Sequence, residues 1–209
     1  MARHLTIGEM IKTVIFDLGN VIVPFDFTIG YAGIQRLCGH GADEVRRRLR
    51  STDLVTRFES GQVEPEEFVR QFSKLLEMET SYEDFCNVWT SVFLPETLIP
   101  DSLVERIHES HRLLLLSNTN DIHFSMIERT YPILRHFDDR VLSYRVGAVK
   151  PSARIYQEAI ARSGCLPEEC FFIDDVPAYV EGARREGIDA VQFQSASQVE
   201  EELKARGVL

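Results

Sequence analysis

The chain lacks two features that mark nucleic-acid-binding and membrane proteins. Lys and Arg number 23 against 33 Asp and Glu among 209 residues, so the formal net charge is −10 and there is no basic excess. Phosphate backbones attract basic surfaces, and we therefore expect no nucleic-acid partner. A helix that spans a membrane needs roughly 20 consecutive apolar residues. The sequence has no such run, so we expect no membrane association.

Cysteine is scarce, and its spacing does not match a metal site. The four cysteines are Cys38, Cys86, Cys165 and Cys170. Unpaired thiols are typical of reducing compartments, so we expect reduced side chains in a cytoplasmic protein. The hydrophobic share of 44% and the charged share of 27% are those of a globular chain that can bury a sizeable core.

What the chain does contain is a series of short, continuously apolar segments separated by helical patterns. Such segments are typical of parallel strands that are buried on both faces, and helices between them indicate βαβ units. The predicted strands are residues 13–16, 113–116, 140–144, 170–173 and 190–193. The sequence therefore predicts an α/β fold with a doubly wound parallel sheet.

The long stretch between the first two predicted strands has helical periodicity instead. Residues 66–77 place Phe68 and Phe72 on one face. Thr80 with Glu83 matches a capping box ahead of a second aromatic-rich helix. The regular spacing favours packing of these aromatic side chains in a core over a substrate pocket. An all-helical domain inserted after the first strand follows from this pattern.

We divide the chain into two parts on this basis. Residues 1–23 and 99–209 form the α/β core, and residues 24–98 form a small helical cap. The cap also carries a basic cluster of four arginines, at Arg46, Arg47, Arg48 and Arg50. We interpret the cluster as a solvated face, with the alternative that one arginine reaches the substrate.

Polar side chains follow three of the predicted strands. They are Asp17, Ser117, Asn118, Asp174 and Asp175. The carboxyl ends of parallel strands lie at one edge of an open sheet, where ligands bind. Lys150 precedes a proline that starts a predicted helix. Taken singly, these residues also fit a turn, a helix cap or an exposed surface, whereas the whole set in this order favours a catalytic site.

Four segments in this order resemble the motifs of the haloacid dehalogenase superfamily, most of whose members are phosphatases. They are FDLGNV at 16–21, LSNTN at 116–120, KPSARIY at 150–156 and FIDD at 172–175. Within the superfamily they are similar to the sugar-phosphate phosphatase branch of the glucose-1-phosphate type. The resemblance implies a Rossmann-like core with a helical cap inserted after the first strand, as the periodicity also predicts.

The resemblance further implies hydrolysis of a small phosphate monoester, such as a sugar 1-phosphate, through an aspartyl-phosphate intermediate. Asp17 would be the nucleophile. Mg²⁺ prefers oxygen ligands, and here Asp17, the backbone carbonyl of Gly19 and Asp174 would hold it. Asp175 would support the metal site. The partner would be a small phosphorylated metabolite, bound by a monomer or a homodimer.

The same resemblance assigns the phosphoryl group to three further residues. Ser117 and Asn118 would donate hydrogen bonds to its oxygens, and Lys150 would supply a positive charge. Charge of this kind is needed because a carboxylate nucleophile and a phosphate repel each other.

One position departs from the family pattern. The usual first motif has a second aspartate two residues after the nucleophile, and this chain has Gly19 there. That aspartate protonates the leaving group, and loss of a general acid typically costs about 10²- to 10⁴-fold in rate. Asp26 is our candidate for a substitute, although it also suits a helix N-cap.

The missing aspartate leaves two other functions open. A 2-haloacid dehalogenase needs no acid, because halide leaves without a proton. A non-catalytic homologue that binds a phosphorylated metabolite would need neither an acid nor a nucleophile.

Overall fold

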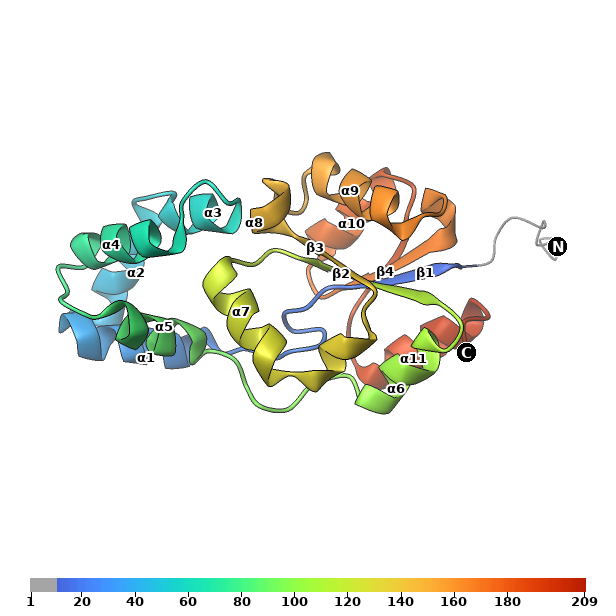
Figure 1. Ribbon diagram of the computed structural model, residues 1–209, viewed down its shortest axis with the longest axis horizontal. Helices are drawn as coiled ribbons and strands as arrows, with labels where there is room; N and C mark the ends of the chain where they lie inside the picture. The colour runs from blue at the N-terminus through green and yellow to red at the C-terminus, as the bar shows by residue number, and fades with distance from the viewer. Residues whose placement is uncertain (1–10) are drawn as a thin grey trace.

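A five-stranded parallel sheet forms the centre of the α/β part (Figure 1). The computed structural model describes residues 11–209. The strands are β1 (Thr13–Phe16), β2 (Arg112–Ser117), β3 (Asp139–Leu142), β4 (Cys170–Asp174) and β5 (Asp189–Gln192). Their order in the sheet is β3-β2-β1-β4-β5. The strand order reverses beside β1, and ligands bind at such reversals in α/β sheets. The predicted fold class is confirmed.

Alternating side chains of the strands pack against helices on the two faces of the sheet. Val14 and Phe16 contribute to one buried cluster and Ile15 to the other, as the two-residue period of a strand requires. One face is covered by α6 (Asp101–His108), α7 (Asp121–Thr130) and α11 (Ala196–Ala205). The other is covered by α9 (Ala153–Ser163) and α10 (Pro177–Arg185). Short helical turns complete this part: η1 (Pro132–His136), α8 (Ser143–Val146) and η2 (Pro167–Glu169).

Five helices form a group of their own at one end of the molecule (Figure 1). They are α1 (Phe27–Cys38), α2 (Ala42–Arg50), α3 (Leu54–Glu59), α4 (Pro65–Leu75) and α5 (Tyr82–Thr90). Their shared core is aromatic: the Phe68 ring stacks on Phe58 at 4.0 Å between centroids and also contacts Phe72, Phe85 and Trp89. The prediction that the aromatic pattern builds a core is confirmed. The bounds 24–98 for the cap stay our division of the chain.

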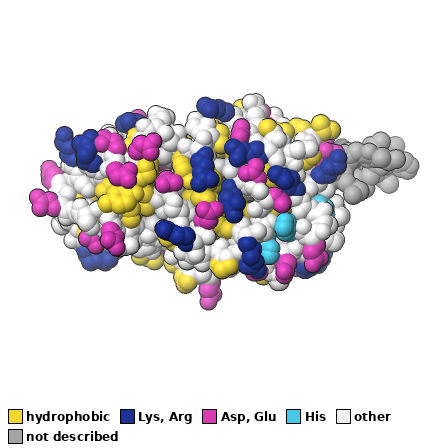
Figure 2. All heavy atoms as spheres, in the orientation of Figure 1, with side chains coloured by type: hydrophobic (Ala, Val, Ile, Leu, Met, Phe, Trp, Pro, Cys, Tyr) yellow, Lys and Arg dark blue, Asp and Glu magenta, His cyan; other side chains and the backbone are white. Residues whose placement is uncertain are grey.

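The surface carries mixed charge. On the face shown in Figure 2, basic and acidic side chains are interspersed, and hydrophobic side chains gather over the helical end. Within residues 11–209, no helix has the length and apolarity to cross a membrane.

Two local predictions were wrong in detail. The strand predicted at 140–144 ends at Leu142, because the Ser143 hydroxyl exchanges two hydrogen bonds of 2.9 Å with the Thr119 backbone and the chain turns into α8. The helix predicted to start from Thr80 is capped one residue later. The Ser81 hydroxyl accepts from the Asp84 N–H at 3.0 Å.

Candidate active site

The turn after β1 places Asp17 at the edge of the sheet. Phe16 pairs with Leu115 on one side and Ile173 on the other, so the ends of β1, β2 and β4 are level. The Asp17 N–H still donates to the Ile173 carbonyl at 2.9 Å. Asn20 then adopts a positive φ of 53°, a conformation that asparagine tolerates better than most residues. The chain turns back at this point and leaves the Asp17 carboxylate facing a cleft.

Lys150 lies between two carboxylates at the bottom of this cleft. Its ammonium donates to Asp17 Oδ1 at 2.8 Å, to Asp174 Oδ2 at 2.5 Å and to the Leu116 carbonyl at 3.0 Å. Only 2% of Lys150 is exposed. All three ammonium hydrogens therefore have acceptors, and the lysine fixes the relative positions of Asp17 and Asp174.

Asn118 holds the lysine loop in place. Its side-chain oxygen accepts from the Lys150 N–H at 2.8 Å, and its amide nitrogen donates to the Lys150 carbonyl at 3.1 Å. The side chain expected to contact a phosphoryl group is thus engaged with the backbone of Lys150. Ser117 is freer, since its buried hydroxyl has only a 3.5 Å contact with the Asn118 carbonyl. All three predicted phosphate ligands, Ser117, Asn118 and Lys150, line the cleft.

Three carboxylates form a group that suits a divalent cation. One oxygen each of Asp17, Asp174 and Asp175 can be chosen so that all lie within 4.8 Å of one another. Gly19 lines the same cleft. Oxygen donors of this kind are the preferred ligands of Mg²⁺. The donor set therefore fits the predicted metal.

The electrostatics of the site show an excess of negative charge. Burial raises the pKa of Asp17 to about 7, because desolvation and the neighbouring Asp174 outweigh the attraction of Lys150. Burial and Asp174 also raise the pKa of Asp175. For Lys150, burial favours the neutral amine, but Asp17 and Asp174 outweigh it and raise the pKa. A bound cation would favour the ionised carboxylates and reduce repulsion of an incoming phosphate.

The position of the missing aspartate is filled by an aromatic ring. A Cβ atom built on Gly19 would lie 2.8 Å from Cε1 of Phe25. The Phe25 ring in turn packs on Phe27 at 4.7 Å and on Phe93 at 6.2 Å between centroids. The Phe25 ring thus leaves room only for glycine at position 19. Any larger residue at position 19 would require the ring to move.

Asp26 has a clear structural role. It is the N-cap of α1, and its carboxylate accepts from the Thr28 N–H at 2.8 Å. Hydrogen bonds from Thr28 lower the pKa of Asp26, whereas a general acid at neutral pH needs a raised one. The acid/base function of Asp26 stays a prediction.

Glu59 and Tyr179 belong to the cleft and were not predicted from the sequence. Glu59 ends α3 and faces the cleft from the helical part, and burial raises its pKa to about 7. Tyr179 of α10 contacts Asn118 through its hydroxyl at 3.4 Å, and its ring centroid lies 5.0 Å from the Lys150 ammonium. Neither follows an apolar strand, so no local pattern indicated either one.

Comparison with known proteins places the chain in a family. Residues 11–187 match the haloacid dehalogenase-like hydrolases, and this match covers most of the chain. The chain therefore belongs to the haloacid dehalogenase-like hydrolases, which confirms the resemblance of its four motifs.

Individual relatives are more distant. The chain is 26% identical over 200 residues to a D-ribitol-5-phosphate phosphatase of Bacteroides thetaiotaomicron, and the alignment covers 93% of this chain and 97% of the relative. It is 27% identical over 195 residues to phosphatase MT3486 of Mycobacterium tuberculosis, covering 90% and 89%. A family enzyme from B. thetaiotaomicron, solved with magnesium and inorganic phosphate, has a TM-score of 0.79 and 24% identity. That alignment covers 88% of this chain and 95% of the other.

Proposed function

We propose that the protein is a magnesium-dependent hydrolase of small phosphate monoesters. The observation that carries this proposal is the buried Lys150 ammonium between Asp17 and Asp174, with Asp175 beside them. This arrangement offers a nucleophile, a fixed positive charge and a set of oxygen ligands at one end of a cleft of about 280 Å³. The phosphatases among its relatives and the magnesium and phosphate bound to a similar structure support the same chemistry.

The reaction we propose has two steps. The Asp17 carboxylate attacks phosphorus and forms an aspartyl-phosphate while the alkoxide leaves, and water then hydrolyses the acyl-phosphate. Lys150 holds Asp17 in position and stabilises the phosphoryl oxygens, and Ser117 donates a hydrogen bond to them. Mg²⁺, held by Asp17, Asp174 and the Gly19 carbonyl with Asp175 in support, would supply further positive charge for the transferring group.

Protonation of the leaving group is assigned to the helical part of the molecule. Phe25 fills the space beside Gly19, whereas Glu59 faces the cleft with a pKa near neutrality. A carboxyl group of this kind is protonated often enough at neutral pH to act as an acid. The alternative donor is Asp26, and a sugar 1-phosphate would need less help because its anomeric oxygen leaves more readily.

Phosphate release tests the proposal. We expect release from p-nitrophenyl phosphate and from a panel that includes ribitol 5-phosphate and sugar 1-phosphates, and we expect chelation of magnesium to abolish it. Asp17→Asn should lose turnover and keep its circular dichroism spectrum. Turnover in that variant at the parent rate would overturn the nucleophile. Halide release from 2-haloacids without any phosphate release would assign the chain to the dehalogenases instead.

The proton donor is tested separately. Glu59→Gln should lower kcat by about 10²-fold on an alkyl phosphate. It should change turnover of p-nitrophenyl phosphate much less, because nitrophenolate leaves without a proton. Equal losses on the two substrates would show that Glu59 acts in some other way.

A further inference from the structure

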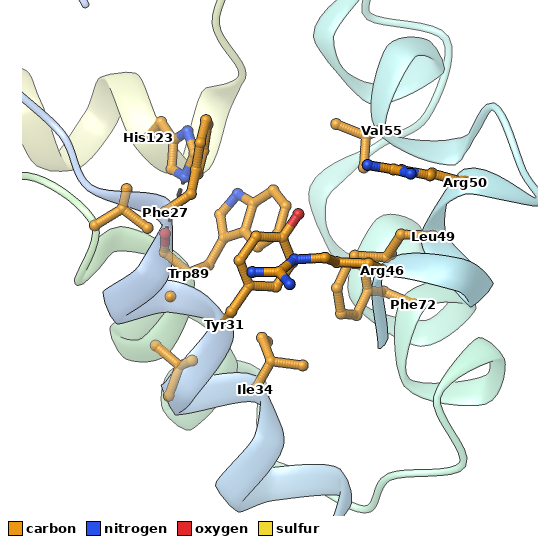
Figure 3. A pocket seen from close by; sticks show the side chains of 13 residues that line it. Phe27, Tyr31, Ile34, Arg46, Leu49, Arg50, Val55, Phe72, Trp89 and His123 are labelled. Carbon is orange, nitrogen blue, oxygen red and sulfur yellow. Dashed lines mark hydrogen bonds between the residues drawn. The ribbon is translucent and has the colours of Figure 1, made fainter. Parts of the chain in front are cut away.

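A second cavity, of about 250 Å³, lies among the cap helices (Figure 3). Its walls are mostly apolar and aromatic, and Arg46 and Arg50 of α2 also line it. The apolar and aromatic residues include Phe27, Tyr31 and Ile34 of α1, Leu49 of α2, Phe72 of α4 and Trp89 of α5. For comparison, an apolar cavity of about 150 Å³ can stay dry and bind benzene. The cap cavity is therefore large enough for an aromatic ring.

The cap cavity adjoins the catalytic cleft. Five residues line both spaces: Phe27, Val55, Trp89, Val92 and His123. The two spaces are therefore adjacent, as they must be if one substrate is to reach from Lys150 into the cap.

Close packing on one side keeps the cavity from collapsing. A Cβ on Gly30 would lie 2.6 Å from a methyl group of Val92, and one on Gly33 would lie 2.5 Å from a methyl group of Val88. Helix α1 thus packs closely against α5 and against Val92, which follows α5. These two helices cannot move closer together, so they cannot close the cap cavity beside them.

The wall between the two spaces is uncharged and contains an unsatisfied donor. His123 stacks on Trp89 at 5.2 Å between ring centroids, and burial lowers its pKa to about 4, so the imidazole is neutral. The indole nitrogen of Trp89 is buried and has no hydrogen-bond partner among residues 11–209. A buried donor without an acceptor costs free energy.

Resting on the proposed phosphatase function, we propose that the cap cavity binds an aromatic ring of the substrate alcohol. The preferred substrate is then a phosphate monoester with an aromatic group a few bonds from the ester oxygen. The phosphate occupies the Lys150 end of the cleft. The ring lies in the cap cavity beside Trp89 and the Arg46 guanidinium, which covers the Tyr31 ring at 4.9 Å.

The test compares propyl phosphate with 3-phenylpropyl phosphate, whose leaving groups are chemically alike. Burial of a phenyl-sized group predicts a kcat/KM about 10- to 100-fold higher for the phenyl ester. The kcat/KM values for nucleoside 5′-monophosphates show whether a nucleobase can supply the ring. The value for ribitol 5-phosphate shows whether a polyol without a ring is hydrolysed as well. Equal kcat/KM for the propyl and phenylpropyl esters would overturn the aromatic site. Absence of phosphate release from every ester, p-nitrophenyl phosphate included, would instead overturn the proposed function.

A cavity-filling variant tests the location. Leu49→Trp narrows the cavity and should bring the ratio of phenylpropyl to propyl kcat/KM close to one. Leu75→Trp is the matched control, because Leu75 is also a half-buried cap leucine and does not line the cavity. Leu49→Ala widens the cavity and should shift the preference towards a naphthyl ester, which provides a second test if Leu49→Trp does not fold. An unchanged ratio in both Leu49 variants would contradict the proposal.

Binding can also be measured without turnover. Trp89 is the sole tryptophan of the chain, so tryptophan fluorescence reports this wall alone. We expect 3-phenylpropylphosphonate to change the fluorescence with a Kd at least about tenfold below that of propylphosphonate. The same Kd for both phosphonates would place the ring outside the cavity.

Discussion

At the scale of single residues, the side chains of the site are held in place by their contacts with one another. Lys150 has three acceptors and almost no exposed surface, so neither Asp17 nor Asp174 can turn away without leaving the ammonium short of a partner. An unpaired buried charge is costly. The nucleophile is therefore held in place before any substrate arrives, as electrostatic preorganisation requires.

Asp26 illustrates how a capping residue can be distinguished from an acid. Asn is about as good an N-cap as Asp, whereas Ala loses about 1 kcal/mol of stability. Because the Asp26 carboxylate is exposed and caps α1, we expect Asp26→Asn to change kcat less than threefold and Asp26→Ala to lower the free energy of unfolding. Urea unfolding and steady-state kinetics measure the two effects. A loss of about 10²-fold in kcat for the asparagine variant would restore Asp26 as the acid.

Glu59 should make stability depend on pH. Its pKa rises from 4.5 to about 7 on folding, because burial disfavours the carboxylate. The protonated form therefore stabilises the fold fully below the unfolded pKa, and this contribution is lost as the pH rises through about 7. Glu59→Gln cannot ionise, so its Tm should match that of the parent near pH 5 and exceed it at pH 8. The exposed Glu79→Gln serves as the control, and a parallel pH profile for both variants would contradict the argument.

At the scale of elements, the turn after β1 packs against the first residues of the cap. Gly19 and Phe25 occupy one space, since any side chain at position 19 would begin with a Cβ only 2.8 Å from the ring, so neither can be changed alone without cost. The ring closes the gap that the missing side chain would leave.

A double-mutant cycle checks this pairing. Gly19→Asp should lower the free energy of unfolding by about 1–3 kcal/mol, the usual cost of overpacking. The cost should shrink when Phe25→Ala makes room, so the two changes should show a coupling of at least about 1 kcal/mol. Chemical denaturation of the four proteins measures it. Additive effects within about 0.5 kcal/mol would mean that the two residues do not share the space.

The same scale shows what the sequence could predict. The apolar runs that end on Asp17, Ser117 and Asp174 indicate both the strands and the site, so fold class and site location were predicted together. The sequence could not predict the place of Glu59 or the cap cavity, because both depend on how helices far apart in the chain meet the cleft. The side chain of Asn118 was assigned to the phosphate, but its contacts with the Lys150 backbone depend on tertiary geometry.

At the scale of the whole molecule, the cleft is shared between two structural parts. Asp17, Lys150 and Asp174 belong to the α/β part, whereas Glu59 and Trp89 come from the helices α3 and α5. Movement of the helical group would bring Glu59 and the aromatic wall towards or away from the bound phosphate. Such movement admits substrate and excludes bulk water in many enzymes.

Ligand binding should stabilise the folded protein as a whole. A ligand that binds only the native state adds about 2.7 kcal/mol at a concentration of 100 times its Kd. We therefore expect magnesium to raise the Tm of the parent protein and of Asp26→Asn, and to leave Asp174→Asn unaffected because that variant lacks a carboxylate of the site. Differential scanning fluorimetry with magnesium and with chelator measures this. An equal shift in Asp174→Asn would place the metal elsewhere.

The central position of β1 also has a consequence for the order of folding. Thr13 pairs with Arg112 on one side and with Cys170 on the other. The first strand of residues 11–209 to be synthesised therefore stays unpaired until partners far along the chain have been made. The five cap helices have their core within one continuous stretch of chain, apart from Ile122. Contacts between near neighbours in sequence form faster than distant ones. The cap can therefore collapse during synthesis while β1 is still unpaired, and the active site is completed only when β4 joins the sheet.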